Sequence, residues 1–400
     1  TNVAAQAQFG VGMDWPMAGI SIQGRNNNAV ENTITTANVN RLMDKWTKFT
    51  GGFANASPFV AFNGNLYTGD VRGAIRVYSS TGALLWTAAT GSDLESVTPV
   101  AHGGLVFFGA ANGNVYAYSA ACRRDGKACT PKWTKSVGTA VTGSLRVSAN
   151  KLYVPSSDGS VHVLNPVTGA AATPVFGFDA TAGSVTTPIT FGGDGTLYYG
   201  AGSTFEYRTP DGSAGGLPKG GTVSPVAASN GAAYYTTGDG KINEFGGAGW
   251  SAVTSGAGCA PAPAVANGLV YAGGCTTLAA FEAGRGTLRW SVTTPGAVIG
   301  ISVANGIAYA CVNPGSGFGG LVTAYDASFG GLLWSGGRCT GGAPIIADGV
   351  VYAAFANITA YGLPGAQSAA VPARPAPKTL RPNFRLLPGK ANIVQMGEAE

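Results

Sequence analysis

The side chains best suited to metal or acid–base chemistry are a small set of carboxylates, because only 19 of the 400 residues are acidic. Calcium takes carboxylate and amide oxygens as ligands, and a general base is often Asp or Glu. Asp158, Asp194 and Asp239 each precede a glycine, so we interpret them as turn-forming residues. Glu95 comes just before an apolar strand, which makes it the candidate to face a ligand, and Asp326 is discussed below.

Histidine and cysteine chemistry is narrowly limited. The two histidines, His102 and His162, are too few for a histidine-based metal cluster, and without a CxxCH sequence there is no covalently attached c-type haem. The cysteines are even in number and form no CxxC pair, which favours disulfides over a metal site. These residues are Cys122, Cys129, Cys259, Cys275, Cys311 and Cys339.

Disulfides imply an oxidising compartment. We therefore expect a mature, exported chain whose leader has been removed, located in the periplasm, at the cell surface or outside the cell. The alternative is a cytosolic protein with six unpaired core thiols.

The composition describes a folded, glycine-rich chain. It has 63 glycines, 45% hydrophobic residues and 11% charged residues, which excludes a disordered polyelectrolyte. Glycine has no three-residue period, so the chain is not collagen. No apolar run is long enough for a membrane-spanning helix, and a net charge of +5 is too modest to indicate a nucleic-acid-binding protein.

One pattern recurs along the chain: a small residue, an apolar pair, an Asn-Gly or similar turn, and an aromatic-rich strand. Periods of about 20–50 residues indicate stacked or ring architectures. Such turns occur at Asn63-Gly64, at Asn150-Lys151 and at Asn267-Gly268, and Asn-Gly between apolar runs is a strong hairpin signal. The eight copies begin near Pro58, Pro99, Leu145, Pro188, Pro225, Pro263, Ser302 and Pro344.

The copies carry the signals of short antiparallel strands, and four such strands are the unit of a β-propeller blade. The last copy, residues 345–361, supplies only three strands, whereas Lys45-Trp46-Thr47 near the start is a fourth-strand pattern with no preceding three. We predict an all-β, eight-bladed β-propeller whose ring is closed when the strand around Trp46 completes the eighth blade. Removing residues 41–50 should then unfold the whole domain.

The predicted organisation is a lead segment over residues 1–40, the propeller over residues 41–365 and a basic, proline-rich arm over residues 366–400. The arm contains five prolines and five basic residues between Ser368 and Lys390, without an acidic residue. Such a segment favours extended polyproline II structure.

A family resemblance lies in the segment that ends each blade. Ala324–Trp334 fits the pattern A-x-D-x-x-x-G-x-x-x-W, Ala280–Trp290 fits with Glu in place of Asp, and Val77–Trp86 fits more loosely. This resembles the tryptophan-docking repeat of the quinoprotein dehydrogenase superfamily, the eight-bladed PQQ-type propellers, over roughly residues 12–365. The lead, with Asp14-Trp15-Pro16-Met17, is similar to the entry of the polyvinyl-alcohol-dehydrogenase-like branch.

Asp326 belongs to the repeat pattern itself, so we expect it to form a structural hydrogen bond. Large rings at the pattern's last position are expected to bury against the neighbouring blade. The blade-docking candidates are Trp46, Trp86, Trp133, Trp250, Trp290 and Trp334. Phe176 replaces tryptophan in the third copy, and the fourth copy has none.

A catalytic member of this superfamily would carry a vicinal Cys-Cys disulfide, a Ca²⁺ or lanthanide ion and an Asp base. No two cysteines are adjacent here and carboxylates are scarce, so the family's cofactor residues match no position. We predict no catalytic, cofactor-binding or metal-binding residue. The alternative is a PQQ- and Ca²⁺-dependent quinoprotein dehydrogenase that oxidises an alcohol or a sugar.

Blade geometry suggests how the cysteines pair. The linker into a blade's first strand and the turn after its second strand lie on one face of the ring, which favours Cys259–Cys275 and Cys311–Cys339. Cys122 and Cys129 flank the insertion Arg123–Ala128 on the opposite face. This basic hairpin is either a contact element or a stabilised loop.

The arm is the clue to a partner. We expect it to dock on a neighbouring subunit or on a partner protein, with contact candidates Arg381, Phe384, Arg385 and Leu386. The sequence thus favours an exported, non-catalytic, PQQ-like propeller that acts in protein binding or assembly.

Overall fold

The computed structural model describes residues 14–49, 59–94, 97–122, 125–172, 176–177, 185, 187–201, 203–218, 222–254, 256–315, 319–339, 342–355 and 357–365. Contacts divide the chain into one unit over Thr1–Ala369 and a second over Ala370–Glu400. All described residues belong to the first unit. The arm candidates Arg381, Phe384, Arg385 and Leu386, and also Glu95, lie outside the described residues.

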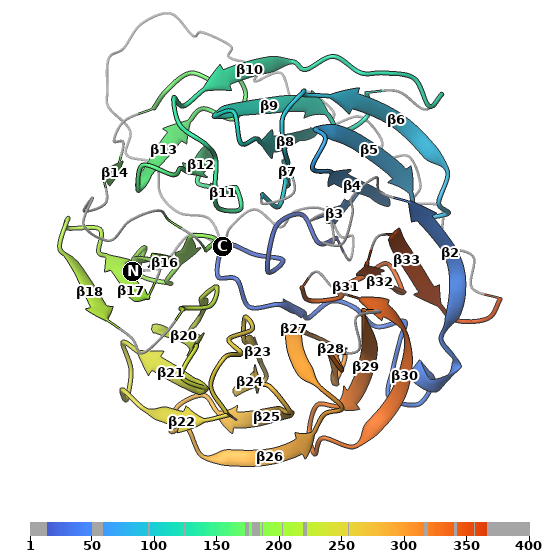
Figure 1. Ribbon diagram of the computed structural model, residues 1–400, viewed down its shortest axis with the longest axis vertical. Helices are drawn as coiled ribbons and strands as arrows, with labels where there is room; N and C mark the ends of the chain where they lie inside the picture. The colour runs from blue at the N-terminus through green and yellow to red at the C-terminus, as the bar shows by residue number, and fades with distance from the viewer. Residues whose placement is uncertain are drawn as a thin grey trace, which may run out of the picture. The chain divides into compact units, whose positions relative to one another are not determined.

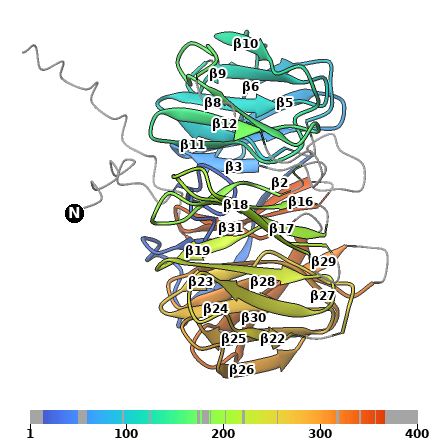
Figure 2. The same cartoon turned by 90° about the vertical axis from the view of Figure 1, so that its left-hand side faces the viewer.

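The described residues form eight sheets arranged as a ring (Figure 1). Figure 2 shows this ring edge-on, with the blue to green blades above and the yellow to red blades below. In seven blades the four strands follow one another in the sequence and pair antiparallel from the innermost to the outermost. The prediction of an eight-bladed propeller is confirmed.

The first four blades run in chain order. Blade 1 is β3 (Phe59–Phe62), β4 (Asn65–Gly69), β5 (Ala74–Ser79) and β6 (Leu84–Ala89); blade 2 is β7 (Val100–His102), β8 (Leu105–Gly109), β9 (Asn114–Ser119) and β10 (Trp133–Ser136). Blade 3 is β11 (Arg146–Ser148), β12 (Lys151–Pro155), β13 (Ser160–Leu164) and β14 (Phe176–Gly177); blade 4 is β15 (Thr190–Phe191), β16 (Leu197–Ala201), β17 (Thr204–Arg208) and β18 (Ala214–Pro218).

The remaining blades close the ring. Blade 5 is β19 (Ala227–Ser229), β20 (Ala232–Thr237), β21 (Lys241–Phe245) and β22 (Ser251–Val253); blade 6 is β23 (Ala264–Ala266), β24 (Leu269–Gly273), β25 (Thr277–Glu282) and β26 (Leu288–Thr293). Blade 7 is β27 (Ala297–Ala304), β28 (Ile307–Asn313), β29 (Gly320–Asp326) and β30 (Leu332–Cys339). Blade 8 is β31 (Ile345–Ala347), β32 (Val350–Ala354), β33 (Asn357–Gly362) and the N-terminal strand β2 (Met43–Phe49).

The closing contact is the pairing of β2 with β33. These strands are antiparallel, with Trp46 opposite Ala360, and in Figure 1 the blue β2 lies beside the red β33. The Trp46 ring packs against Tyr352 of the same blade at a centroid distance of 6.0 Å. The prediction that the two ends of the propeller share its eighth blade is confirmed, and the sheet edge of β33 is thereby covered.

The hairpin turns follow from local chemistry. A type I′ turn needs positive φ at two successive residues, and Asn63 and Gly64 have φ values of 52° and 69°. In blade 3 the turn lies at Ala149 and Asn150, with φ values of 46° and 56°, one residue before the predicted Asn150-Lys151. The register of β11 and β12, which pairs Ser148 with Lys151, requires that shift.

The blades bury their faces against one another in a series of apolar clusters. Strands β3 and β32 are buried throughout, whereas the outer strand β30 is mostly half-buried or exposed. This gradient places the most constrained backbone next to the ring axis. None of the described residues forms a helix long and apolar enough to cross a membrane.

Candidate functional site

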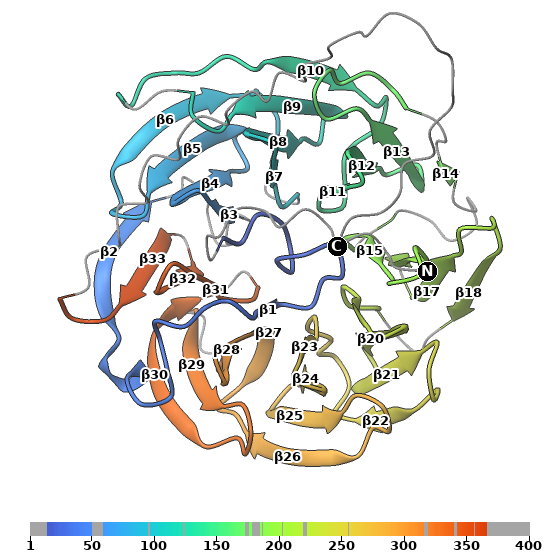
Figure 3. The same ribbon diagram turned by 180° about the vertical axis from the view of Figure 1, so that it is seen from behind.

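The lead segment has a structural role that the sequence did not indicate. Residues 15–34 pass along the inner strands of the blades in order, and Figure 3 shows its strand β1 (Asn27–Asn28) beside β27. Backbone hydrogen bonds join Trp15 to Ala61 at 2.7 and 3.0 Å, and β1 pairs in parallel with β27. The lead therefore holds the inner rim of the ring rather than only preceding it.

The contacts of the lead recur at equivalent places. In six blades an inner-strand residue two positions before the first hairpin turn donates its backbone N–H to a lead carbonyl: Ala61 to Trp15, Ala101 to Pro16, Phe191 to Ile22, Ala228 to Gln23, Val265 to Arg25 and Val303 to Asn26. In blade 8 the side chain of Asn28 donates to the carbonyl of Ile346 at 2.7 Å.

Blade 3 is held by a side chain instead. Arg146 in β11 donates through Nη1 to the carbonyls of Ala18 and Ser21, the latter at 2.7 Å, and through Nε to the carbonyl of Ile189 at 3.0 Å. The arginine is only 2% exposed. It joins the lead to blades 3 and 4 at once.

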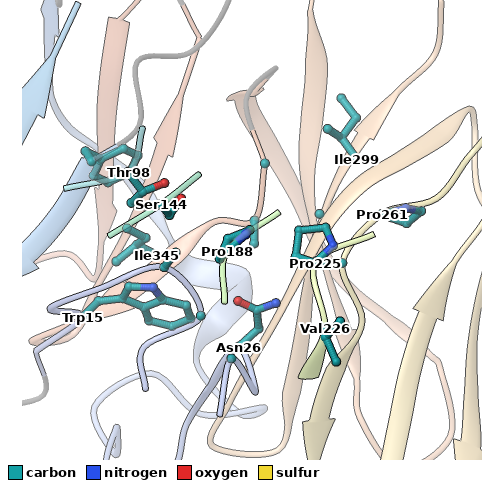
Figure 4. A pocket seen from close by; sticks show the side chains of 18 of the residues that line it. Trp15, Asn26, Thr98, Ser144, Pro188, Pro225, Val226, Pro261, Ile299 and Ile345 are labelled. Atoms are coloured by element: carbon teal, nitrogen blue, oxygen red, sulfur yellow. The ribbon is translucent and has the colours of Figure 1, made fainter. Parts of the chain in front are cut away.

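An axial cavity of about 340 Å³ lies against the lead and is partly open to solvent. The lead supplies Trp15, Gly19 and Asn26 to its lining, and all eight blades contribute residues within or just before their inner strands. Figure 4 shows proline and aliphatic side chains around this space, together with Ser144 and Thr98. Among the described residues, Arg146 is its one charged lining residue, and no carboxylate lines it.

Of the carboxylates singled out in the sequence, Glu95 lies outside the described residues, and the other four do not line this cavity. Asp158 accepts hydrogen bonds from the Ser156 hydroxyl at 2.5 Å and the Ser160 amide at 2.9 Å. Asp194 accepts from Thr196 at 2.7 and 3.0 Å. Asp239 accepts from Thr237 and forms an ion pair of 2.9 Å with Lys241; the Thr237 hydrogen bond lowers the pKa of Asp239.

Their turn-forming role therefore agrees with the interpretation from sequence, and Asp326 likewise accepts a bond from the Ser328 amide at 2.8 Å. Other structural carboxylates were missed, and Glu31 and Asp70 are two of them. Glu31 accepts from the amides of Thr33, Ile34 and Gly349, and the fully buried Asp70 pairs with Arg76 at 2.7 Å. Neither residue precedes a glycine, so neither has the local sequence that indicates a turn-forming carboxylate.

The two histidines are strand residues. His102 ends β7 and His162 lies within β13, opposite Val154. No group of three or more His, Cys, Asp or Glu side chains in the described part of the chain could hold a metal ion.

Four of the six blade-docking tryptophans make the same contact with the next blade. Each indole Nε1 donates to a backbone carbonyl of the following blade, at or just before the turn between its third and fourth strands. The indole ring lies against the glycine of the same turn. The donor–acceptor pairs are Trp46–Ser80 (2.8 Å), Trp133–Pro166 (3.1 Å), Trp250–Ala283 (2.9 Å) and Trp290–Ala327 (3.0 Å). The glycines are Gly82, Gly169, Gly286 and Gly330.

Trp86 and Trp334 meet different neighbours. The Trp86 ring packs against Tyr118 of blade 2 at 5.6 Å, and its Nε1 has no hydrogen-bond partner among the described residues. The Ala120 carbonyl of blade 2 has the place of the carbonyls that accept from the other four tryptophans, and it accepts from the Tyr67 hydroxyl at 3.1 Å. Trp334 packs against Tyr361 at 5.6 Å, because blade 8 receives its fourth strand from the other end of the chain and has no third turn.

The six cysteines form three disulfides, as expected: Cys122–Cys129, Cys259–Cys275 and Cys311–Cys339. The described part of the first loop lies along β6. The Gly126 amide donates to the Leu85 carbonyl at 2.8 Å and the Cys129 amide to the Thr87 carbonyl at 2.7 Å. The loop thus covers an outer sheet edge, whereas Arg123 and Arg124 lie outside the described residues.

A PQQ–Ca²⁺ site does not fit these residues. A divalent cation of this kind needs several oxygen ligands with carboxylates among them, and the described lining offers one amide, two hydroxyls and no carboxylate. The amide nitrogen of Asn26 already donates to the Pro263 carbonyl at 3.1 Å. No catalytic step through that cofactor follows from the described geometry.

Solved structures share the fold at low sequence identity. The quinohemoprotein alcohol dehydrogenase of Comamonas testosteroni superposes with a TM-score of 0.67 at 14% identity, over 87% of this chain and 80% of that one. BamB of Moraxella catarrhalis gives a TM-score of 0.60 at 13% identity, over 82% and 99%. A europium-containing methanol dehydrogenase gives 0.68 at 14% identity, over 87% and 91%.

No curated protein sequence matches this chain. A family model does: the one described as outer membrane protein assembly factor BamB matches residues 30–242 and 219–375. Those residues span the eight blades and the closing strand β2, and they begin just after β1. The resemblance to PQQ-like repeats is therefore confirmed, and the chain belongs to the family of PQQ-like propellers described as outer membrane protein assembly factor BamB.

Proposed function

We propose that this chain is an exported, non-catalytic propeller that binds protein, and that its arm, residues 366–400, docks on a neighbouring subunit. The observation that supports this most is the lining of the axial cavity, where the described residues include no carboxylate and a single charged side chain, Arg146. Three disulfides agree with an oxidising compartment.

The composition of the arm supports its docking role. Its basic and proline-rich sequence is preorganised toward an extended form, which lowers the entropy lost on binding. The apolar Phe384, Leu386 and Leu387 would provide the buried anchors that dominate such contacts.

The test is the molar mass in solution by light scattering. We expect the full chain to assemble, and a chain that ends at Gly365 to have a smaller assembly mass. A full-length variant with Phe384→Ser and Leu386→Ser should behave like the truncated chain, whereas Lys390→Ser should not. An unchanged mass after truncation would contradict the docking role.

The competing function is a PQQ-dependent dehydrogenase, as in the solved alcohol and methanol dehydrogenases. Adding PQQ with Ca²⁺ and following dye reduction with a panel of alcohols and sugars distinguishes the two. Turnover would replace our proposal with the enzymatic one.

A further inference from the structure

Arg146 is a buried cation whose partners among the described residues are all neutral. Its three hydrogen bonds go to the backbone carbonyls of Ala18, Ser21 and Ile189. The remaining nitrogen, Nη2, makes no hydrogen bond within the described residues, and Arg146 borders the axial cavity. A guanidinium has five N–H donors, so donors remain for a ligand in that space.

No carboxylate among the described residues compensates the charge of Arg146. Burial lowers its pKa to about 9, and no carboxylate opposes that effect. Buried charges in proteins are normally paired, because an unpaired charge loses its hydration without return. An anion beside Nη2 would restore the missing partner.

The rest of the cavity sets the kind of anion. Trp15, Pro225 and Ile345 are among the apolar side chains that surround the space (Figure 4). Ser144 lies two residues before Arg146 and lines the same cavity, where its hydroxyl can be a second donor. A volume of about 340 Å³ is at the small end of ligand sites, which limits the ligand to a compact molecule or a chain end.

We propose that the axial cavity binds a carboxylate carried on a compact apolar body, with the carboxylate at Arg146 and the apolar body against Trp15, Pro225 and Ile345. The carboxylate comes either from a small organic acid or from the C-terminus of a peptide. This site is independent of the docking role of the arm, since the two use different parts of the chain.

Calorimetry on the full, wild-type chain tests the charge requirement. The probes are 3-phenylpropanoate and its amide, and acetyl-Pro-Phe with a free or an amidated C-terminus. Charge-assisted hydrogen bonds are the strong ones, so we expect each acid to bind at least about tenfold more tightly than its amide. Tighter binding of 3-phenylpropanoate assigns the site to small acids, and tighter binding of the peptide acid assigns it to chain ends.

A matched pair of variants tests the location without disturbing Arg146, whose replacement would also release the lead. Thr98→Trp places a large ring at the cavity lining, whereas Val167→Trp places it in an outer turn where the side chain is 66% exposed. Both should unfold at the wild-type urea midpoint. We expect Thr98→Trp to weaken acid binding at least about tenfold and Val167→Trp to leave it unchanged. Equal binding of acid and amide, no binding by either acid, or unchanged binding in Thr98→Trp would overturn the proposal.

Discussion

Replacing the turn glycine beneath a docking tryptophan should reveal the free energy of the interblade contact. In blade 7, Gly330 has a φ of +80°, and a Cβ there would lie 2.7 Å from Cε3 and 2.9 Å from Cδ2 of Trp290. Those distances are too short for carbon atoms in contact, so in Gly330→Ala the indole must move away from the turn. Trp290 is 8% exposed and donates to Ala327 at 3.0 Å, so it cannot move without losing contacts.

The same blade offers a matched control. Gly306 has a φ of +75° and nothing within 4 Å of an added Cβ, so Gly306→Ala carries the backbone strain alone, about 1 kcal/mol. Gly330→Ala adds overpacking of about 1–3 kcal/mol and a weakened hydrogen bond of about 1 kcal/mol. We therefore expect Gly330→Ala to lower the free energy of unfolding by roughly 2–4 kcal/mol more than Gly306→Ala does.

The assay is urea unfolding followed by circular dichroism for the wild type and both variants, with tryptophan fluorescence as a second probe. The fluorescence of Gly330→Ala before unfolding should differ from that of the wild type, because a docked indole has moved. Equal losses of stability in the two variants would refute the reasoning, since the tryptophan would then contribute nothing beyond the strain of the turn.

Three further predictions concern the lead, pH and the disulfides. Arg146→Met should lower the free energy of unfolding by roughly 3 kcal/mol, because three hydrogen bonds to backbone carbonyls are lost. It should also speed proteolysis within residues 14–34, as read by mass spectrometry, whereas the exposed ion-pair variant Arg289→Met should do neither. Burial, and then the nearby Asp348, raise the pKa of Asp14 from 3.8 to about 6. The folded state therefore holds this proton more tightly than the unfolded state does. The stability that the protonated Asp14 contributes is lost as pH rises from about 4 to 6, by about 1 kcal/mol after solvent screening. Asp14→Asn should abolish that loss in urea midpoints, and a pH profile identical to that of the wild type would contradict the prediction. Replacing both cysteines of Cys311–Cys339 by alanine should cost about 1 kcal/mol more than replacing those of Cys122–Cys129, because the separations are 28 and 7 residues; equal thermal shifts would contradict this.

The ring and its closure could be predicted because their signals are local. Turn pairs such as Asn63-Gly64 mark each hairpin, and the eighth copy visibly lacks the strand that Trp46 supplies. Disulfide pairing followed once the linkers and turns were placed on the faces of a blade.

The inner rim could not be predicted for an equally physical reason. The lead binds mostly through backbone amides and carbonyls, which every residue has, so no side-chain pattern marks its path. Arg146 occupies an ordinary strand position between Leu145 and Val147, and only the packed ring shows that it is buried without a carboxylate. The indole nitrogen of Trp86, which has no hydrogen-bond partner in the described part of the chain, could not be predicted either. Its repeat position is intact, and the neighbouring turn is what changed.

The parts of the propeller that are synthesised first depend on contacts with the parts that are synthesised last. Asn28 and Glu31 leave the exit tunnel early, but their partners Ile346 and Gly349 are 318 residues later. Strand β2 likewise waits for β33. Contacts so distant in sequence slow folding, and the ring cannot close before β33 has been made. Until then the lead and β2 lack their partners in the eighth blade, so the edge of the sheet that closes the ring stays open.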